Sequence, residues 1–164
     1  MTEIVISRML ARFNYDPELG SLRFRTGTRR GALAGSKRRR GDLDVMVDGV
    51  RYGVHRIAWA MHYREQPPRL IDHINGDPGD NRIENLRPAT HSQNAANAFR
   101  HGEKKLGLAK GVSLTPAGRY AASVYKDGVR HNCGTFGSED EAHAAYLAKA
   151  SAVFGEYANA GYRE

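Results

Sequence analysis

The stretch IDHINGDPGDNRIENLRPATHSQN, residues 71–94, constrains the fold more than any other part of this 164-residue chain. It opens with a short apolar run and continues with Asn-Gly and Asp-Pro-Gly-Asp, which are turn-forming sequences. The segment RIENLR, residues 82–87, then predicts a second short strand. THSQ is a capping box, in which Thr90 caps and Gln93 reaches back, so it predicts a helix from His91 to about residue 100. The order strand, loop, strand, helix indicates a small α+β unit.

The same stretch places Asp72 beside His73 and is rich in asparagine. On a strand, adjacent side chains point to opposite faces, so Asp72 and His73 would serve different roles unless the strand ends or bends there. Asn94, near the start of the following helix, can point back at the strand end. One carboxylate and one amide oxygen suit Mg²⁺ that keeps its waters, and a neutral His beside them could deprotonate a water. Taken alone, Asp-His before Asn-Gly is more often a turn.

The segments before this stretch predict further elements of the same unit. Residues 3–13 indicate a short amphipathic helix, and residues 14–25 indicate a turn followed by a strand. Residues 43–55 alternate apolar and polar side chains around an Asp-Gly pair, which predicts a β-hairpin with a two-residue turn. Residues 56–63 predict a helix in which Trp59 belongs to the core.

The remaining residues predict a second unit. Residues 103–109 are interpreted as a linker between a first domain of residues 1–102 and a second domain of residues 110–164. The second domain contains three short strand segments, separated by Pro-Ala-Gly and Lys-Asp-Gly turns. Another capping box, SEDE, opens a helix that runs to about Phe154. We therefore predict a small three-stranded antiparallel sheet packed on one helix.

The formal net charge is +7, which points to a polyanion as partner, most often nucleic acid. Residues 22–40 carry basic side chains and no acid. A solvated loop is one interpretation. Like charges spaced this closely repel one another unless an anion neutralises them, so a loop that grips DNA phosphates is favoured. Its basic residues are Arg23, Arg25, Arg29, Arg30, Lys37, Arg38, Arg39 and Arg40.

Cysteine usage and hydropathy exclude several other classes of protein. The chain has one cysteine, Cys133, which excludes a disulfide framework and a zinc site built from several thiolates. We interpret Cys133 as a small buried hydrophobe. No apolar run approaches the length of a membrane span, and the N-terminus lacks a signal-peptide pattern. We therefore expect a soluble, cytoplasmic protein with no membrane partner.

Four motifs, VHRIAW, IDHINGD, DNRIENLR and ATHSQNAAN, resemble in order and spacing the homing-type HNH endonucleases of phages and mobile introns, in the branch that uses His-Asn-Asn. The resemblance covers about residues 12–100. It implies a ββα-metal site that hydrolyses double-stranded DNA with one Mg²⁺ or Mn²⁺ per active site. It makes His73 the general base that activates water, and it makes Asp72 and Asn94 the metal ligands. Asn85 would hold the loop between the strands and orient His73.

Two more histidines have open roles within this resemblance. His55 precedes the Trp59 helix, so it would touch DNA phosphate or brace the site, although a purely structural His is nearly as common there. His91 lies on the same helical face as Asn94 and could be a metal ligand or a phosphate contact. The lack of paired cysteines matches the homing-type branch rather than the zinc-bound HNH proteins.

Residues from 110 to about 160 resemble the ethylene-response-factor, or Apetala-two, DNA-binding domain of plant transcription factors, most specifically in GTF followed by SEDEAHAAY. A β-sheet of this kind can lie in the major groove. Several of the family's DNA-facing positions usually carry Arg or Trp, and here they carry smaller residues, so the plant target sequence is not carried over. The resemblance places DNA contacts at Lys110, Ser113, Thr115, Arg119, Ser123, Tyr125, Arg130 and Asn132.

These patterns together predict a two-unit DNA endonuclease, monomer or homodimer, with an HNH nuclease followed by a sheet-type DNA-binding domain. The main alternative is a non-catalytic DNA-binding regulator with a degenerate nuclease unit, and RNA cleavage is a third possibility. The presence of Asp72, His73, Asn85 and Asn94 argues against degeneration.

Overall fold

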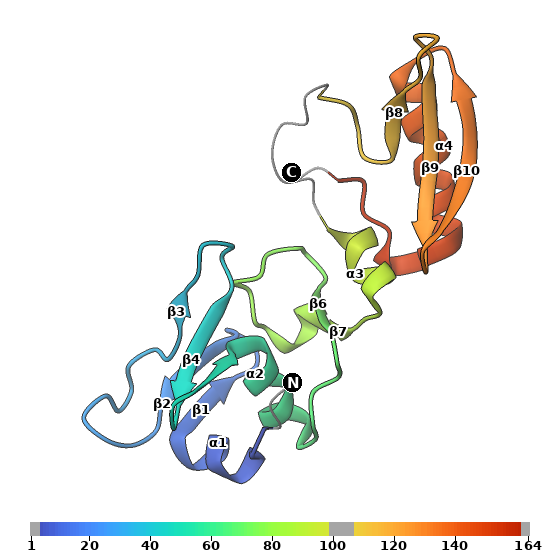
Figure 1. The fold of residues 1–164 in the computed structure, drawn as a ribbon. Helices are drawn as coiled ribbons and strands as arrows, with labels where there is room; N and C mark the ends of the chain where they lie inside the picture. The colour runs from blue at the N-terminus through green and yellow to red at the C-terminus, as the bar shows by residue number, and fades with distance from the viewer. Residues whose placement is uncertain (1–3, 99–106, 162–164) are drawn as a thin grey trace. The chain divides into compact units, whose positions relative to one another are not determined.

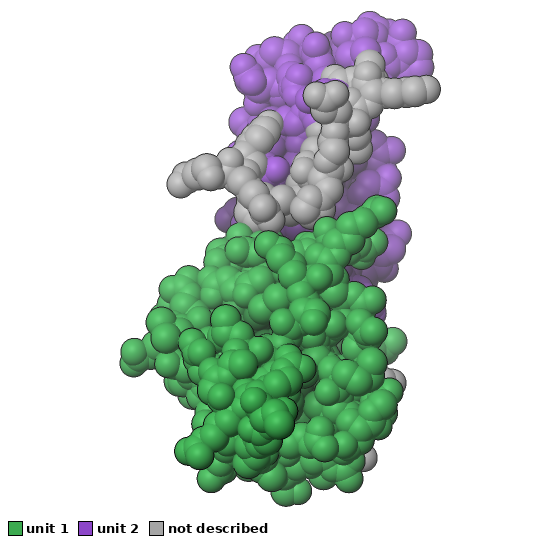
Figure 2. Space-filling model, turned by 90° about the vertical axis from the view of Figure 1, so that its left-hand side faces the viewer, with its two compact units in different colours: residues 1–89 green, residues 90–164 purple. Residues whose placement is uncertain are grey.

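The computed structural model describes residues 4–98 and 107–161 (Figure 1). The chain divides into two compact units, residues 1–89 and residues 90–164 (Figure 2). Both units combine helices with antiparallel strands, which confirms the predicted α+β class. The predicted linker, residues 103–109, lies mostly outside the described residues, and the predicted domain limits stay a prediction.

The described part of the first unit builds three small antiparallel sheets, which pair β1 with β2, β4 with both β3 and β5, and β6 with β7. Its elements are α1 (Ile6–Arg12), β1 (Phe13–Asp16), β2 (Ser21–Phe24), β3 (Ser36–Lys37), β4 (Leu43–Val47), β5 (Val50–Gly53), α2 (Val54–Tyr63), β6 (Ile71–His73), the 3₁₀ turn η1 (Ile83–Asn85) and β7 (Leu86–Pro88).

Apolar side chains from α1, β1, β2, β4 and α2 form the main core of this unit. Met9 of α1, Phe13 of β1 and Ile57 of α2 are almost completely buried there. Burying a side chain of this kind contributes roughly 1.5–3 kcal/mol to the free energy of unfolding. A smaller cluster brings Trp59 together with Ile71 and other side chains of the β6–β7 region, so α2 supports that hairpin. The prediction that Trp59 belongs to the core is confirmed.

The turn between β4 and β5 has the predicted two-residue form. Asp48 and Gly49 both have positive φ, 51° and 79°, as a type I′ turn requires. The Asp48 carboxylate also accepts hydrogen bonds from Arg8 at 2.9 Å and Arg12 at 2.6 Å, which tie α1 to this turn. These pairs are exposed and add little to stability.

Three local predictions need correction. The basic segment is not a simple loop, because Leu33 bridges to Arg23 and β3 pairs with β4, which satisfies backbone groups close to the core. Residues 83–85 form a 3₁₀ turn, so the second strand of the hairpin starts only at Leu86. Helix α3 ends at Asn97 rather than near residue 100, and the Asn97 side chain is buried.

The described part of the second unit contains α3 (His91–Asn97), β8 (Val112–Leu114), β9 (Tyr120–Lys126), β10 (Val129–Phe136), α4 (Glu139–Phe154) and the 3₁₀ turn η2 (Gly155–Tyr157). The strands form an antiparallel sheet in the order β10-β9-β8. Both predicted capping boxes are present, at the start of α3 and at the start of α4.

The sheet of the second unit packs on α4, as predicted. Ala122 and Val124 of β9 are buried against it, and the buried helix residues Ala142, Tyr146 and Ala150 recur every fourth position. A methyl group on Gly111, which has φ +78°, would overlap the Tyr146 ring, so only glycine permits this close approach. Cys133 lies at the edge of this core and is half-buried. No helix in the described part of the chain is long and apolar enough to cross a membrane.

Candidate active site

The β6–β7 hairpin places the predicted catalytic and metal-binding groups of the first unit. Cross-strand pairing puts Asp72 opposite Arg87 and His73 opposite Leu86. Residues 74–85 connect the strands and include η1. Asp72 and Arg87 are both buried, and the Asp72 Oδ2 atom accepts a hydrogen bond from Arg87 Nε at 2.9 Å. The hairpin therefore carries a buried ion pair directly beside His73.

In the described part of the first unit, the ring of His73 contacts Asn81 and His55. Its Nε2 atom lies 3.4 Å from the Oδ1 atom of Asn81, a residue that is only 1% exposed. The ring of His55, at the start of α2, meets it edge-on, with 5.5 Å between the ring centroids. The hairpin loop on one side and α2 on the other thus restrict the orientation of His73.

Both histidines are held in the neutral form near pH 7. Burial, together with smaller effects of the neighbouring His73 and Arg56, lowers the pKa of His55 to about 4. Burial also lowers the pKa of His73, although the hydrogen bond with Asn81 and nearby carboxylates act in the opposite direction. A neutral imidazole keeps a lone pair, so His73 can accept a proton.

Asn85 organises the loop between the strands. Its Oδ1 atom accepts from the backbone N–H of Asn75 at 2.9 Å, and its Nδ2 atom donates to Asn75 Oδ1 at 3.0 Å and to the Asp80 carbonyl at 2.8 Å. The Ile74 N–H, next to His73, donates to the Asn85 carbonyl at 2.9 Å. This geometry can hold the loop in the way that the resemblance implies for Asn85.

The acids of this loop are engaged in structure. The Asp80 carboxylate binds the Arg82 guanidinium, with its shortest contact at 2.7 Å, and it also accepts from Asn75 at 2.7 Å. These hydrogen bonds lower the pKa of Asp80. Asp77 accepts from the Gly79 N–H at 2.9 Å. We therefore assign these two acids to loop geometry rather than to proton transfer.

The donor chemistry of the predicted metal ligands fits Mg²⁺ or Mn²⁺. Asp72 supplies a carboxylate, which can bind through either oxygen, and Asn94 supplies an amide oxygen. Asn94 and His91 are both exposed on α3, in the second unit, and the joint site of Asp72 with Asn94 stays a prediction. Among the described residues, no three or more His, Cys, Asp or Glu side chains gather as a ready-made metal site. The predicted site would not form such a cluster, because its protein ligands are one carboxylate, from Asp72, and one amide oxygen, from Asn94.

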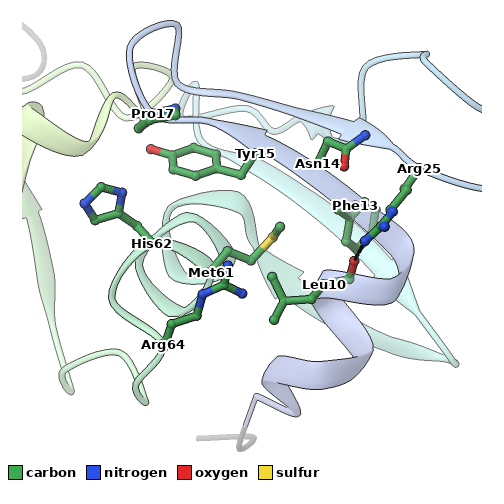
Figure 3. Close-up of a pocket in the computed structure, with 9 residues that line it drawn as sticks. All are labelled: Leu10, Phe13, Asn14, Tyr15, Pro17, Arg25, Met61, His62 and Arg64. Carbon is green, nitrogen blue, oxygen red and sulfur yellow. Dashed lines mark hydrogen bonds between the residues drawn. The ribbon is translucent and has the colours of Figure 1, made fainter.

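A hollow of about 370 Å³ lies elsewhere in the first unit (Figure 3). Its lining comes from α1, β1, α2 and the adjoining loops, and it includes Tyr15, His62 and Arg64. Neither Asp72 nor His73 lines it, so we do not identify this hollow with the catalytic chemistry.

The basic segment before β4 is partly engaged within the protein. Arg38 pairs with Asp44, Arg23 donates to the Gly31 carbonyl, and Arg25 donates to the Leu10 carbonyl (Figure 3). Arg29 lies over the Phe24 ring, 4.2 Å from its centroid. Within the described part of the chain, no hydrogen bond, ion pair or ring contact engages four of the basic side chains. They are Arg30, Lys37, Arg39 and Arg40.

The second unit brings most of its predicted DNA contacts onto one face of the sheet. Strand pairing sets Arg130 opposite Tyr125 and Asn132 opposite Ser123, and cross-strand partners share a face. Ser113 shares this face through its pairing with Ala121. The face lies opposite the α4-facing side chains Ala122 and Val124.

Three other predicted contacts of the second unit hold the fold together instead. Lys110 Nζ donates to the carbonyls of Ala96, Ala98 and Asn159, so a DNA contact would require those hydrogen bonds to break. Arg119 donates to the Thr135 and Phe136 carbonyls, and its backbone N–H donates to Thr115 Oγ1.

Sequence reasoning missed Asn81 and Arg87 as members of the site. Spacing could not reveal either contact, because one depends on a folded loop and the other on strand register. The only available signal was the strand register: pairing His73 with Leu86 at the two ends of the loop places Asp72 opposite Arg87.

Two comparisons with known proteins find similarity to HNH endonucleases. An uncharacterized HNH endonuclease of Acanthamoeba polyphaga mimivirus is 32% identical over 116 residues, which make up 70% of this chain and 59% of that protein. The chain thus spans less than two thirds of that relative's length. No solved structure matches the chain. A family model also matches part of the chain, and its extent includes Asp72, His73, Asn85 and Asn94: residues 52–96 match the HNH endonuclease family.

Proposed function

We propose that this protein is an HNH endonuclease that hydrolyses phosphodiester bonds of double-stranded DNA with a bound divalent metal. The observation that carries the proposal is the half-buried His73, held neutral beside Asp72 on one hairpin, within the segment that matches the HNH family. The net charge of +7 supports a polyanionic substrate.

In this proposal His73 takes the proton from the attacking water. Asp72 and Asn94 hold one Mg²⁺ or Mn²⁺, and the bound ion supplies stabilisation of the charge that develops at the phosphate. Arg87 fixes the orientation of the Asp72 carboxylate through its hydrogen bond. Asn85 keeps the loop after His73 in shape.

DNA would be held by two basic regions with different roles. Arg30, Lys37, Arg39 and Arg40 can grip phosphates without regard to sequence. The outer face of the second unit's sheet, which includes Arg130 and Tyr125, can lie in a groove as in the Apetala-two-like domains that residues 110–160 resemble. The resemblance to the homing-type branch further favours a nuclease of a phage or mobile element.

Supercoiled plasmid incubated with the full chain tests the activity. With Mg²⁺ we expect open circles if each molecule acts alone, or linear DNA if two active sites act together. EDTA should abolish either product, because the reaction needs the metal. A plasmid that stays supercoiled in Mg²⁺ and in Mn²⁺, while it is bound by the protein, would favour the non-catalytic regulator. The same assay with single-stranded RNA tests the third possibility.

The two basic regions should respond differently to mutation. The double variant Arg39→Ala, Arg40→Ala should weaken binding to all duplexes about equally, and should reduce the salt slope by up to ~0.9 log units per lost phosphate contact. If Arg130 reads a guanine edge, Arg130→Ala should cost about 1–3 kcal/mol on the preferred sequence and less on random DNA. Affinities measured over a range of salt would separate the two classes. A uniform loss for Arg130→Ala would show that the sheet only positions the nuclease.

A further inference from the structure

We propose that Asn81 is a positioning residue for His73 and selects its neutral tautomer, with the hydrogen on Nε2 and the lone pair on Nδ1. The inference rests on the proposed function of His73 as general base, and it names the atom of that base that acts. Proton abstraction requires the lone pair to face the water, so the tautomer decides whether a neutral imidazole is competent.

The hydrogen bonds of Asn81 define which of its side-chain atoms faces His73. Its Nδ2 atom donates to the Gly79 carbonyl at 3.0 Å. The Oδ1 atom therefore points to His73 Nε2, at 3.4 Å, and an amide oxygen can only accept. Nε2 must then be the donor, which leaves the lone pair of the neutral ring on Nδ1.

The backbone of Asn81 is fixed from the other side by the β1–β2 hairpin. Tyr15, on β1, donates its hydroxyl hydrogen to the Asn81 carbonyl at 2.7 Å. Burial raises the pKa of Tyr15, so this hydroxyl remains a donor. The Ile83 N–H donates to the Pro17 carbonyl at 3.0 Å. A methyl group on Gly20 would overlap the backbone of Asn81 and Arg82, so the turn after β1 lies directly against this part of the loop.

At position 81, asparagine meets the hydrogen-bonding requirements of its neighbours better than Asp or Leu, the residues closest to it in shape. Asp lacks the N–H that donates to Gly79, and it would set a charge against that carbonyl. Leu has neither donor nor acceptor, so it would leave buried polar groups without partners. Asn81 is itself only 1% exposed, which makes an unsatisfied amide costly, and both ends of the amide are used.

The tautomer can be observed directly by NMR on the full chain labelled with ¹⁵N-histidine, without metal or DNA, at a pH where the rings are neutral. Long-range ¹H–¹⁵N correlations distinguish the protonated ring nitrogen from the bare one, and the His73→Gln variant identifies the His73 signals. We expect His73 to show hydrogen on Nε2 in the wild type. In Asn81→Ala we expect a mixture of tautomers, together with a cleavage rate about 10- to 100-fold lower at unchanged KM for DNA.

Asn14→Ala is the matched control, because Asn14 is exposed in the same unit and should change neither the tautomer nor the rate. Hydrogen on Nδ1 in the wild type would overturn the proposal, and this measurement does not depend on the folding of an Asn81 variant. A wild-type tautomer and rate in Asn81→Ala would also overturn it. Failure of the proposed function looks different: His73→Ala would still cut DNA, while the wild-type ring would still carry hydrogen on Nε2.

Discussion

Replacement of His73 by Ala is expected to lower the rate of DNA cleavage by about a hundred- to ten-thousand-fold and to leave DNA affinity nearly unchanged. The imidazole acts on water, and its half-buried position between His55 and Asn81 gives it little surface for the duplex. Single-turnover cleavage with saturating protein measures the chemical step, and a binding titration in EDTA measures affinity separately.

His62→Ala is the control for the His73 variant, because His62 is exposed on α2 in the same unit. It should cut DNA at the wild-type rate. Thermal unfolding of the His73→Ala protein should stay close to that of the wild type, which would exclude a folding defect as the cause. A His73→Ala protein that cuts nearly normally would remove His73 from the mechanism and direct attention to His55 and His91.

Asp72→Ala should abolish cleavage and also destabilise the first unit. The carboxylate pairs with Arg87 inside the protein, and removing one partner of a buried ion pair costs about 3–5 kcal/mol because the other charge is left without compensation. Loss of activity in this variant therefore has two possible causes, loss of a metal ligand and loss of structure. Denaturant unfolding reports the second cause alone.

The double variant Asp72→Leu, Arg87→Met separates those causes. Replacing both members of a buried ion pair by apolar residues of similar size is often neutral for stability, so unfolding should return toward the wild-type midpoint. Cleavage should remain absent, because no carboxylate is present to hold the metal. If cleavage returned together with stability, Asp72 would have only a structural role and the metal assignment would be wrong.

The fold could be predicted where local chemistry decides the structure. The capping boxes at Thr90 and Ser138 and the Asp48-Gly49 turn depend on neighbouring residues alone, and all three are present. The 3₁₀ turn before Leu86 and the pairing of β3 could not be predicted in this way. The 3₁₀ turn lies against a distant hairpin, whose Pro17 carbonyl accepts from the Ile83 N–H, and β3 has only two residues, which is too short for a strand pattern.

The candidate site also contains residues that a local sequence pattern can identify and residues that only the folded structure reveals. Asp72, His73, Asn85 and Asn94 were assigned because their order and spacing resemble a family, and their roles stay predictions. The contacts of Asn81 and Arg87 depend on three-dimensional register and loop closure, which no local pattern encodes. For Lys110 the sequence suggests a contact that the structure uses otherwise. The Apetala-two resemblance places this residue at DNA, and its Nζ atom donates here to three backbone carbonyls.

The close fit of Gly20 against the loop between β6 and β7 affects how this protein can evolve. Gly20 has φ +64° and touches the loop backbone, and it lies well outside the segment, residues 52–96, that matches the HNH family. The matched segment therefore depends on residues outside it. The turn at Gly20, which packs against its loop, is encoded more than thirty positions upstream of the segment. If recombination exchanged residues 52–96 alone, the incoming loop would pack against a β1–β2 turn that had not evolved with it. Selection should therefore keep the hairpin and the loop as one unit of inheritance.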